Sequence, residues 1–243
     1  MTFIVVNFIF IILIFLISAV IARILIPRIL LISLRKKLFD IPDDRKIHKR
    51  AIPRLGGVSF FPTTLFAFCL VYTFRLLGGD SVSILYASYL LPELLLFACG
   101  MTLLYLTGIA DDLVGVRYRQ KFVIQIFCAC LFPLSGLWIN DLYGLFGIHE
   151  LSVYVGIPFT ILTVVFITNA INLIDGIDGL ASGLSSVALL IFTFLFIEKG
   201  LWSYAMLAAG TFGVLVPFFY YNVFGSVERA RKTVSYTHLT LPT

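Results

Sequence analysis

The sequence has few charged residues for its length. Asp, Glu, Lys and Arg make up only 13% of its 243 residues, while 60% are hydrophobic and the mean hydropathy is +1.04. A soluble domain of this size does not have enough interior to bury so much apolar surface. The composition therefore excludes a soluble globular protein and indicates a polytopic membrane protein.

Two other features are lacking. The four cysteines all fall inside apolar stretches, where they are most simply packing residues, so we infer no disulfide and no redox role. The first apolar stretch has no basic segment before it and no small-residue cleavage site, and it is too long for a signal peptide. We therefore expect a retained membrane helix at the start of the chain.

Seven apolar stretches are candidates to cross a membrane. A helix needs roughly 20 apolar residues to span a hydrocarbon core of about 30 Å. The predicted fold class is therefore all-α, a polytopic transmembrane helical bundle. Its expected helices cover residues 3–26, 57–77, 86–109, 122–138, 151–170, 183–198 and 201–221.

The positive charges predict the orientation of these helices. Nine of the 18 Lys and Arg residues lie within 28–54, three within 117–121 and three within 229–232, whereas the opposite side has only Arg75 and Lys199, and Arg23 lies inside the first helix. By the positive-inside rule, the three basic segments are cytoplasmic and the N-terminus is outside. With seven crossings, every polar cluster then lies on the cytoplasmic face.

The polar run after the fifth apolar stretch is the centre of the predicted site. Its polar members are Asn169, Asn172, Asp175 and Asp178. No Lys or Arg occurs between Lys121 and Lys199, so a local salt bridge is not expected. Three nearby glycines allow close backbone approach to a ligand, and a helix that begins near Leu180 would direct free N–H groups at an anion. The run therefore predicts a phosphate site with a metal ion or a distant basic loop as the partner of the carboxylates.

Two further clusters are predicted on the same face. Asp111 and Asp112 follow the third apolar stretch, and carboxylates at a membrane boundary are functional candidates because they are costly there. Hard oxygen ligands of this kind suit Mg²⁺. The loop 40–57 contains His48 and Lys49, and its cations suit a diphosphate. The simpler alternatives are attraction of the basic loop to anionic lipid headgroups and solvation of a helix end by the acidic pair.

Together these clusters describe a site where a phosphorylated lipid meets a charged nucleotide substrate. Three motifs, in this order and spacing, resemble the polyprenyl-phosphate N-acetylhexosamine-1-phosphate transferases over residues 1–232. They are Asp40-x-Pro-x-x-Arg45-Lys46-x-His48-x-x-x-x-Pro53-x-x-Gly56-Gly57, Gly108-x-x-Asp111-Asp112 and Asn169-Ala-x-Asn172-Leu-Ile-Asp175-Gly-x-Asp178-Gly-Leu-Ala.

The resemblance implies an enzyme of ten or eleven helices in the bacterial cytoplasmic membrane, with its active site facing the cytoplasm. It would transfer a sugar 1-phosphate from a UDP-N-acetylhexosamine to undecaprenyl phosphate and release UMP, with Mg²⁺ or Mn²⁺ as cofactor. The Pro53-Arg-Leu-Gly-Gly segment is similar to the branch that uses UDP-GlcNAc to begin O-antigen, enterobacterial common antigen or teichoic-acid linkage synthesis. The alternative is the peptidoglycan branch, which uses UDP-MurNAc-pentapeptide. The implied partners are these substrates, the lipid bilayer and a second copy in a homodimer, and no nucleic acid.

The resemblance also implies residue roles. Asp111 is the implied base or phosphate-orienting group, and Asp112 is its catalytic partner near the metal. The implied metal ligands are Asp112, Asn172 and Asp175. The implied substrate contacts are His48, Lys49, Arg54, Asn169, Asn172, Asp175 and Asp178.

The chain departs from the family pattern after Lys232. The family continues into a Phe-Met-Gly-Asp-x-Gly-Ser segment that contains the principal metal ligand, whereas residues 233–243 do not resemble it. We therefore expect 1–232 to be an incomplete transferase domain, 233–243 to be a non-native tail, and the fragment to be inactive alone.

Two rival classes stay open. An intramembrane prenyltransferase with an aromatic acceptor also uses Asn and Asp clusters with Mg²⁺, but it spaces them four apart, where Asn172, Asp175 and Asp178 are three apart. An ion-coupled transporter would hold its carboxylates near the bilayer midplane on broken helices. A UDP donor would exclude the first, and carboxylates at helix ends would exclude the second.

Overall fold

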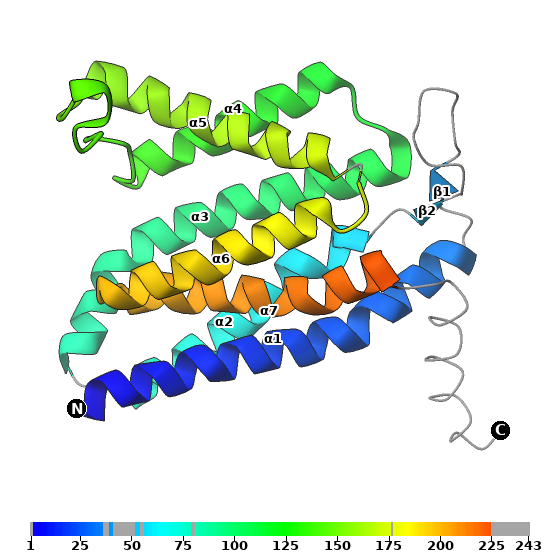
Figure 1. Cartoon of the computed structure of the whole chain (residues 1–243), viewed down its shortest axis with the longest axis horizontal. Coiled ribbons are helices and arrows are strands. Elements are labelled where there is room, and N and C mark those ends of the chain that lie inside the picture. The colour runs from blue at the N-terminus through cyan, green and yellow to red at the C-terminus, as the bar shows by residue number, and fades with distance from the viewer. Residues whose placement is uncertain are drawn as a thin grey trace. The chain divides into compact units, whose positions relative to one another are not determined.

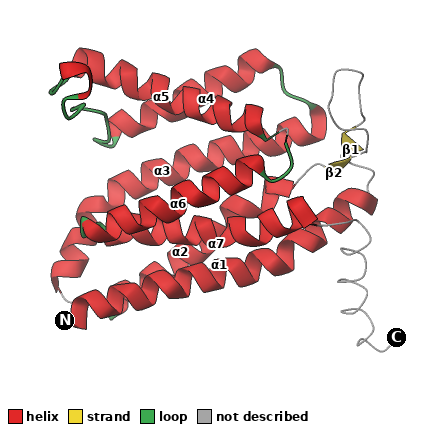
Figure 2. Cartoon of the chain, in the orientation of Figure 1, coloured by secondary structure: helices red, strands yellow, loops and turns green. Residues whose placement is uncertain are grey.

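The computed structural model of the chain describes residues 2–35, 39–40, 52–53, 56–78, 81–175 and 177–224. These residues are almost entirely helical, which confirms the predicted all-α class (Figure 2). The long helices are α1 (Thr2–Arg35), α2 (Phe60–Leu77), α3 (Ser81–Val114), α4 (Tyr118–Leu134), α5 (Val153–Ile174), α6 (Leu180–Glu198) and α7 (Trp202–Phe224). The short elements are the paired antiparallel strands β1 (Phe39–Asp40) and β2 (Ile52–Pro53) and the 3-10 helices η1 (Gly56–Ser59) and η2 (Leu145–Gly147).

Each predicted apolar stretch corresponds to one long helix. Within the described ranges, α1, α2, α3, α5, α6 and α7 are long and apolar enough to cross a membrane. Helix α4 has 17 residues, which is at the lower limit of the roughly 17 to 25 that span a bilayer. Helix α3 runs to Val114, five residues past its predicted end, so Asp111 and Asp112 lie in its last turn. The protein is a multi-pass membrane protein.

The chain forms two compact units, each described here by itself. The first comprises Met1–Gly78 and Ile174–Thr243, and the second comprises Gly79–Leu173. In the first unit α7 packs along α1, α2 and α6. Helices α1 and α7 run in the same direction, and α2 and α6 run in the opposite one (Figure 1). In this unit α6 therefore lies on α7.

Small residues allow α7 to approach α1 closely. The buried ones are Ala205, Ala208, Ala209, Gly210 and Gly213. A Cβ atom at Gly213 would lie 2.5 Å from the backbone oxygen of Phe15, so only glycine fits there. Small side chains at such contacts are typical of membrane helices, because close packing replaces the hydrophobic drive that water supplies elsewhere.

A buried polar contact ties α2 to α1 at the other end of the first unit from the 175–179 loop. Arg75 is only 7% exposed, and its Nε donates a hydrogen bond of 2.7 Å to Oδ1 of Asn7. Its guanidinium also lies 5.2 Å from the ring centre of Phe3, a cation–π arrangement.

In the second unit α3 packs on α4, and a loop joins α4 to α5. The backbone N–H of Ile139 donates to Oγ1 of Thr160 at 2.8 Å, which ties the start of this loop to α5. Gly156 leaves room for the Trp138 ring, because a Cβ atom there would lie 2.5 Å from that ring. The loop is thus anchored to α5 at its base.

Candidate active site

Asp111 is held in one orientation at the end of α3. The backbone N–H of Val116 donates to its Oδ1 at 3.0 Å, and Nζ of Lys121 lies 2.5 Å from its Oδ2. Gly115 ends the helix with φ of +73°, a left-handed conformation that favours glycine, and its N–H donates to the Asp111 carbonyl. The turn therefore brings the first turn of α4 back onto the carboxylate.

The Asp111–Lys121 pair is neither buried nor fully exposed. The two side chains are 33% and 38% accessible, respectively. Asp112 is half-buried beside it. A charged pair with this exposure can rearrange around a ligand without the large desolvation penalty of a buried ion pair.

An open groove of about 610 Å³ lies on α3 and α4, and its lining includes Val116, whose N–H donates to Asp111. It is lined by Leu106, Thr107, Ala110, Val116, Arg119, Gln120, Val123 and Ile124. Most of these side chains are apolar, and Arg119 provides a cation. The groove can therefore accept an apolar chain with an anionic end.

The acidic loop between α5 and α6 is pinned to the end of α7. The backbone N–H of Gly179 donates to Oδ1 of Asn222 at 2.5 Å. Gly179 has φ of +78°, and a Cβ atom there would overlap the side chain of Val223. Only glycine fits this conformation and this space, so Gly179 packs directly against α7.

The environment of Asp175 disfavours its charged form. The side chain reaches solvent, but partial burial of the carboxyl group raises its pKa above the usual range, and the nearby negative charge of Asp178 raises the pKa further. In the part of the chain that the structure describes, the charge that acts on Asp175 is thus another carboxylate. Such a pair is stabilised by binding a cation.

The two asparagines of the third motif lie on α5 and differ in exposure. Nδ2 of Asn169 donates to Oε1 of Gln125 on α4 at 2.9 Å and to the carbonyl of Val165 at 2.8 Å. Asn172 is exposed one turn later. Gln125 therefore fixes the Asn169 amide, whereas Asn172 is open to a ligand.

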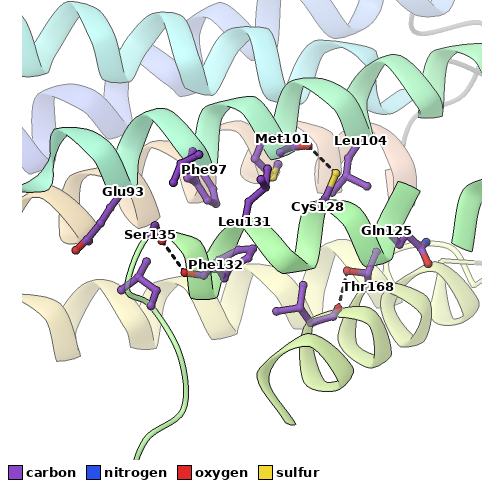
Figure 3. Close-up of a pocket in the computed structure, with 14 residues that line it drawn as sticks. Glu93, Phe97, Met101, Leu104, Gln125, Cys128, Leu131, Phe132, Ser135 and Thr168 are labelled. Carbon is purple, nitrogen blue, oxygen red and sulfur yellow. Dashed lines mark hydrogen bonds between the residues drawn. The ribbon is translucent and has the colours of Figure 1, made fainter. Parts of the chain in front are cut away.

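A small cavity lies deeper between α3, α4 and α5 (Figure 3). It has about 30 Å³ of space, which is room for about one water molecule. Its polar lining includes Glu93 and, at the opposite end in Figure 3, Gln125. The remaining lining is mostly apolar, so this cavity is too small and too dry to hold a nucleotide-sugar.

The structure tests the predicted site only in part. His48, Lys49, Arg54 and the 233–243 tail lie outside the described residues. Asp111, Asp112, Asn169 and Asn172 belong to one unit, and Asp175 and Asp178 belong to the other. No three His, Cys, Asp or Glu side chains gather as a metal site within the described ranges. The convergence of all these groups on one pocket therefore stays a prediction.

Three contributors were not predicted from the sequence. Lys121 contacts Asp111, whereas the sequence pattern indicates only that it is one of the cytoplasmic positive charges. Gln125 follows the polar first turn of α4, and Asn222 lies near the end of the mostly apolar helix α7, where an isolated amide was the available signal.

The fold and these sites define a class: a helical membrane protein whose candidate site groups lie at helix ends. A family model, Glycosyl transferase family 4, matches residues 94–227, more than half of the chain. The chain belongs to this family, as the resemblance of its motifs predicted.

Three curated relatives illustrate the similarity. A probable undecaprenyl-phosphate N-acetylglucosaminyl 1-phosphate transferase of Bacillus subtilis is 31% identical over 65% of this chain and 40% of its own length. An undecaprenyl-phosphate alpha-N-acetylglucosaminyl 1-phosphate transferase of Yersinia pestis is 28% identical over 79% of this chain and 49% of its own. A phospho-N-acetylmuramoyl-pentapeptide-transferase of Staphylococcus carnosus is 30% identical over 70% and 52%. The chain thus spans about half the length of the curated relatives that it matches.

Proposed function

We propose that this protein is a phosphotransferase that moves N-acetylhexosamine 1-phosphate from a UDP-sugar to undecaprenyl phosphate at the cytoplasmic face of the bacterial inner membrane. The names of its relatives support this reaction class, because two are named undecaprenyl-phosphate N-acetylglucosaminyl 1-phosphate transferases and one a phospho-N-acetylmuramoyl-pentapeptide-transferase. The observation that carries the proposal is the fixed Asp111–Lys121 pair beside a mostly apolar groove.

The proposed reaction joins an anionic acceptor to a diphosphate. An oxygen of the lipid phosphate attacks the phosphorus that carries the sugar, the bond between that phosphorus and the bridging oxygen breaks, and UMP leaves with the bridging oxygen. Asp111 orients the acceptor phosphate or takes its remaining proton, and Lys121 offsets the negative charge there. The groove holds the first part of the polyprenyl chain, with Arg119 near its phosphate.

Mg²⁺ is the proposed cofactor, with Mn²⁺ as the alternative. The donor set fits a hard cation, since Asp112, Asn172 and Asp175 offer oxygen ligands, and the like charge of Asp178 leaves Asp175 in need of a positive partner. When bound, the ion neutralises the donor diphosphate. The chain's own groups orient the substrates around it.

The proposed donor is UDP-GlcNAc. Pro53-Arg-Leu-Gly-Gly favours it on sequence, and two of the three relatives described above have N-acetylglucosaminyl in their names. The relative from Staphylococcus carnosus keeps UDP-MurNAc-pentapeptide as the second candidate.

The test is a transfer assay in membranes that contain the complete gene product. Labelled UDP-GlcNAc or UDP-MurNAc-pentapeptide is supplied with undecaprenyl phosphate, and the lipid product and UMP are both quantified. We expect equal amounts of lipid diphosphate-sugar and UMP from UDP-GlcNAc, dependent on added Mg²⁺. Product from the second donor alone would reassign the sugar, and an absence of product from both would refute the proposed reaction.

A further inference from the structure

The loop between α4 and α5 is folded as a compact hairpin. An antiparallel bridge pairs Asp141 with Glu150. Further backbone hydrogen bonds run from Leu142 N to His149 O, from Gly144 N to Ile148 O and from Leu151 N to Asn140 O. Together with the Trp138 and Ile139 contacts to α5, these bonds make the loop a rigid projection from the end of the second unit.

The tip of this hairpin is apolar throughout. Residues 142–148 read Leu-Tyr-Gly-Leu-Phe-Gly-Ile and contain no charged side chain. Tyr143 is 88% exposed and Phe146 is 90% exposed. Leu145 and Ile148 are exposed beside them. A tip of this composition would be unfavourable in water, and exposed apolar patches mark sites of association.

The backbone of the tip adopts an unfavourable conformation at two bulky residues. Tyr143 and Phe146 have φ of +53° and +56°, a left-handed conformation that is unfavourable for bulky side chains. Backbone hydrogen bonds within the hairpin hold this conformation, but both side chains are almost fully exposed, so side-chain packing within the described part of the chain contributes little. An external contact would bury these two side chains.

The exposed side chains of α5, the helix that follows the hairpin, indicate which kind of partner would contact the tip. The first turn of α5 exposes 92% of Tyr154, and the same helix, which is long and apolar enough to span a membrane, also exposes Phe159, Leu162 and Phe166 along its length. The charged groups lie at the base of the hairpin, where the Asp141 carboxylate accepts a hydrogen bond of 2.6 Å from the Tyr143 N–H. The ionisable residues between Tyr143 and Tyr154 are His149 and Glu150, next to the base of the hairpin, and apolar side chains are exposed both at the tip and along α5.

We propose that this hairpin is an interfacial anchor that lies against the bilayer, with Tyr143, Leu145 and Phe146 inserted into the headgroup region. Tyrosine suits this layer because its ring is apolar and its hydroxyl reaches water, and aromatic side chains gather at both membrane surfaces. Interfacial segments bury their apolar side chains by about 5 to 10 Å at the boundary of headgroups and acyl chains. The partner is thus lipid, and the anchor holds irrespective of the catalytic proposal.

Depth-dependent fluorescence quenching tests this anchor in proteoliposomes of the full chain. Phe146→Trp places a probe at the tip, and Asn140→Trp places a matched probe at the polar base. The native Trp138 and Trp202 signals are removed by subtracting the parent protein. Tyr143→Trp is a second tip probe in case Phe146→Trp does not fold. The quenchers are lipids brominated near the headgroup, lipids brominated near the chain end, and acrylamide in the water.

For an inserted tip, we expect the Phe146→Trp signal to be quenched at least about twofold more by the shallow bromolipid than by the deep one, and more than the signal from the base probe. If the hairpin projects into water, bromolipids should quench the base probe more than the tip probe, and acrylamide should be the main quencher of the tip probe. A tip covered by another protein chain, including a second copy, would be shielded from all three quenchers. Either of these results would overturn the proposal.

Discussion

The two acidic regions differ in how their carboxylates are neutralised. At the end of α3, Asp111 has a lysine and a backbone N–H as partners. In the loop after α5, partial burial and the charge of Asp178 both raise the pKa of Asp175. Both regions close on a glycine with positive φ, Gly115 in the first and Gly179 in the second.

This difference indicates different roles for the two acidic regions. A carboxylate that is already paired and oriented is suited to position a substrate group, because its geometry is set before the substrate arrives. A carboxylate destabilised by a like charge is suited to bind a cation, because binding relieves the repulsion. We therefore expect substitutions at Asp111 to affect the reaction step, and changes in the 175–179 loop to affect metal binding and local stability.

The largest expected effect is that of Asp111→Asn. The amide keeps the shape and an acceptor for Val116 N–H but loses the charge and the basic oxygen, so kcat should fall by about 10²- to 10⁴-fold. Transfer assays at saturating donor and acceptor measure it. Asp141→Asn is a matched control, because that carboxylate also accepts a backbone N–H bond but lies in the hairpin. Equal activity of the Asp111 variant and the parent would remove Asp111 from the reaction.

Alanine substitutions of Gly115 and Gly179, one glycine in each acidic region, test how the two regions are packed. Gly115→Ala meets no atom within 4 Å and should cost only the left-handed strain, about 1 to 2 kcal/mol of unfolding free energy. Gly179→Ala meets Val223 and Phe219 as well, so strain and overpacking together should cost about 2 to 5 kcal/mol. Unfolding in detergent micelles measures both. Equal losses would mean that the acidic loop does not pack on α7 as described.

Asn222→Ala should loosen the same loop without adding strain. The Gly179 N–H would lose its acceptor, at a cost of about 1 to 3 kcal/mol for a group left unsatisfied. Hydrogen–deuterium exchange of the peptide that covers residues 175–183 should become faster, and the affinity for Mg²⁺ should fall. Asn140→Ala, in the exposed hairpin base, is the control and should change neither. Unchanged exchange would show that Asn222 does not pin the loop.

Much of the fold could be predicted because an apolar run long enough to span a bilayer has few alternatives to a helix. The ends of the helices were harder to predict. Asp111 and Asp112 suggested a break after residue 109, yet α3 continues through them, because polar residues are compatible with a helix that has left the hydrocarbon core. Helix α3 ends just before Gly115, because the backbone of this glycine is in the left-handed conformation.

The site could be predicted only as a set of acidic motifs. Asp111 and Asp175 stood out because charges are rare in this chain, but their partners did not. Lys121 is ten residues from Asp111 and reaches it only because Gly115 turns the chain, and Asn222 is 43 residues from Gly179. Such contacts depend on how helices pack, which hydrophobic pattern alone does not determine.

The smallest expected effect on stability is that of Lys121→Met. This substitution tests whether Lys121 positions Asp111 for the reaction or stabilises the fold at the end of α3. Lys121→Met removes the cation while Val116 N–H still holds Asp111, so the partly exposed pair should cost only about 0 to 1 kcal/mol of unfolding free energy. Transfer activity should nevertheless fall by about 10- to 100-fold, because a charge-assisted hydrogen bond at the reacting carboxylate is lost. Lys121→Arg keeps the charge and should recover part of the activity. If the methionine variant lost stability and activity in proportion, the pair would be a structural contact, and the contrast with the 175–179 loop would fail.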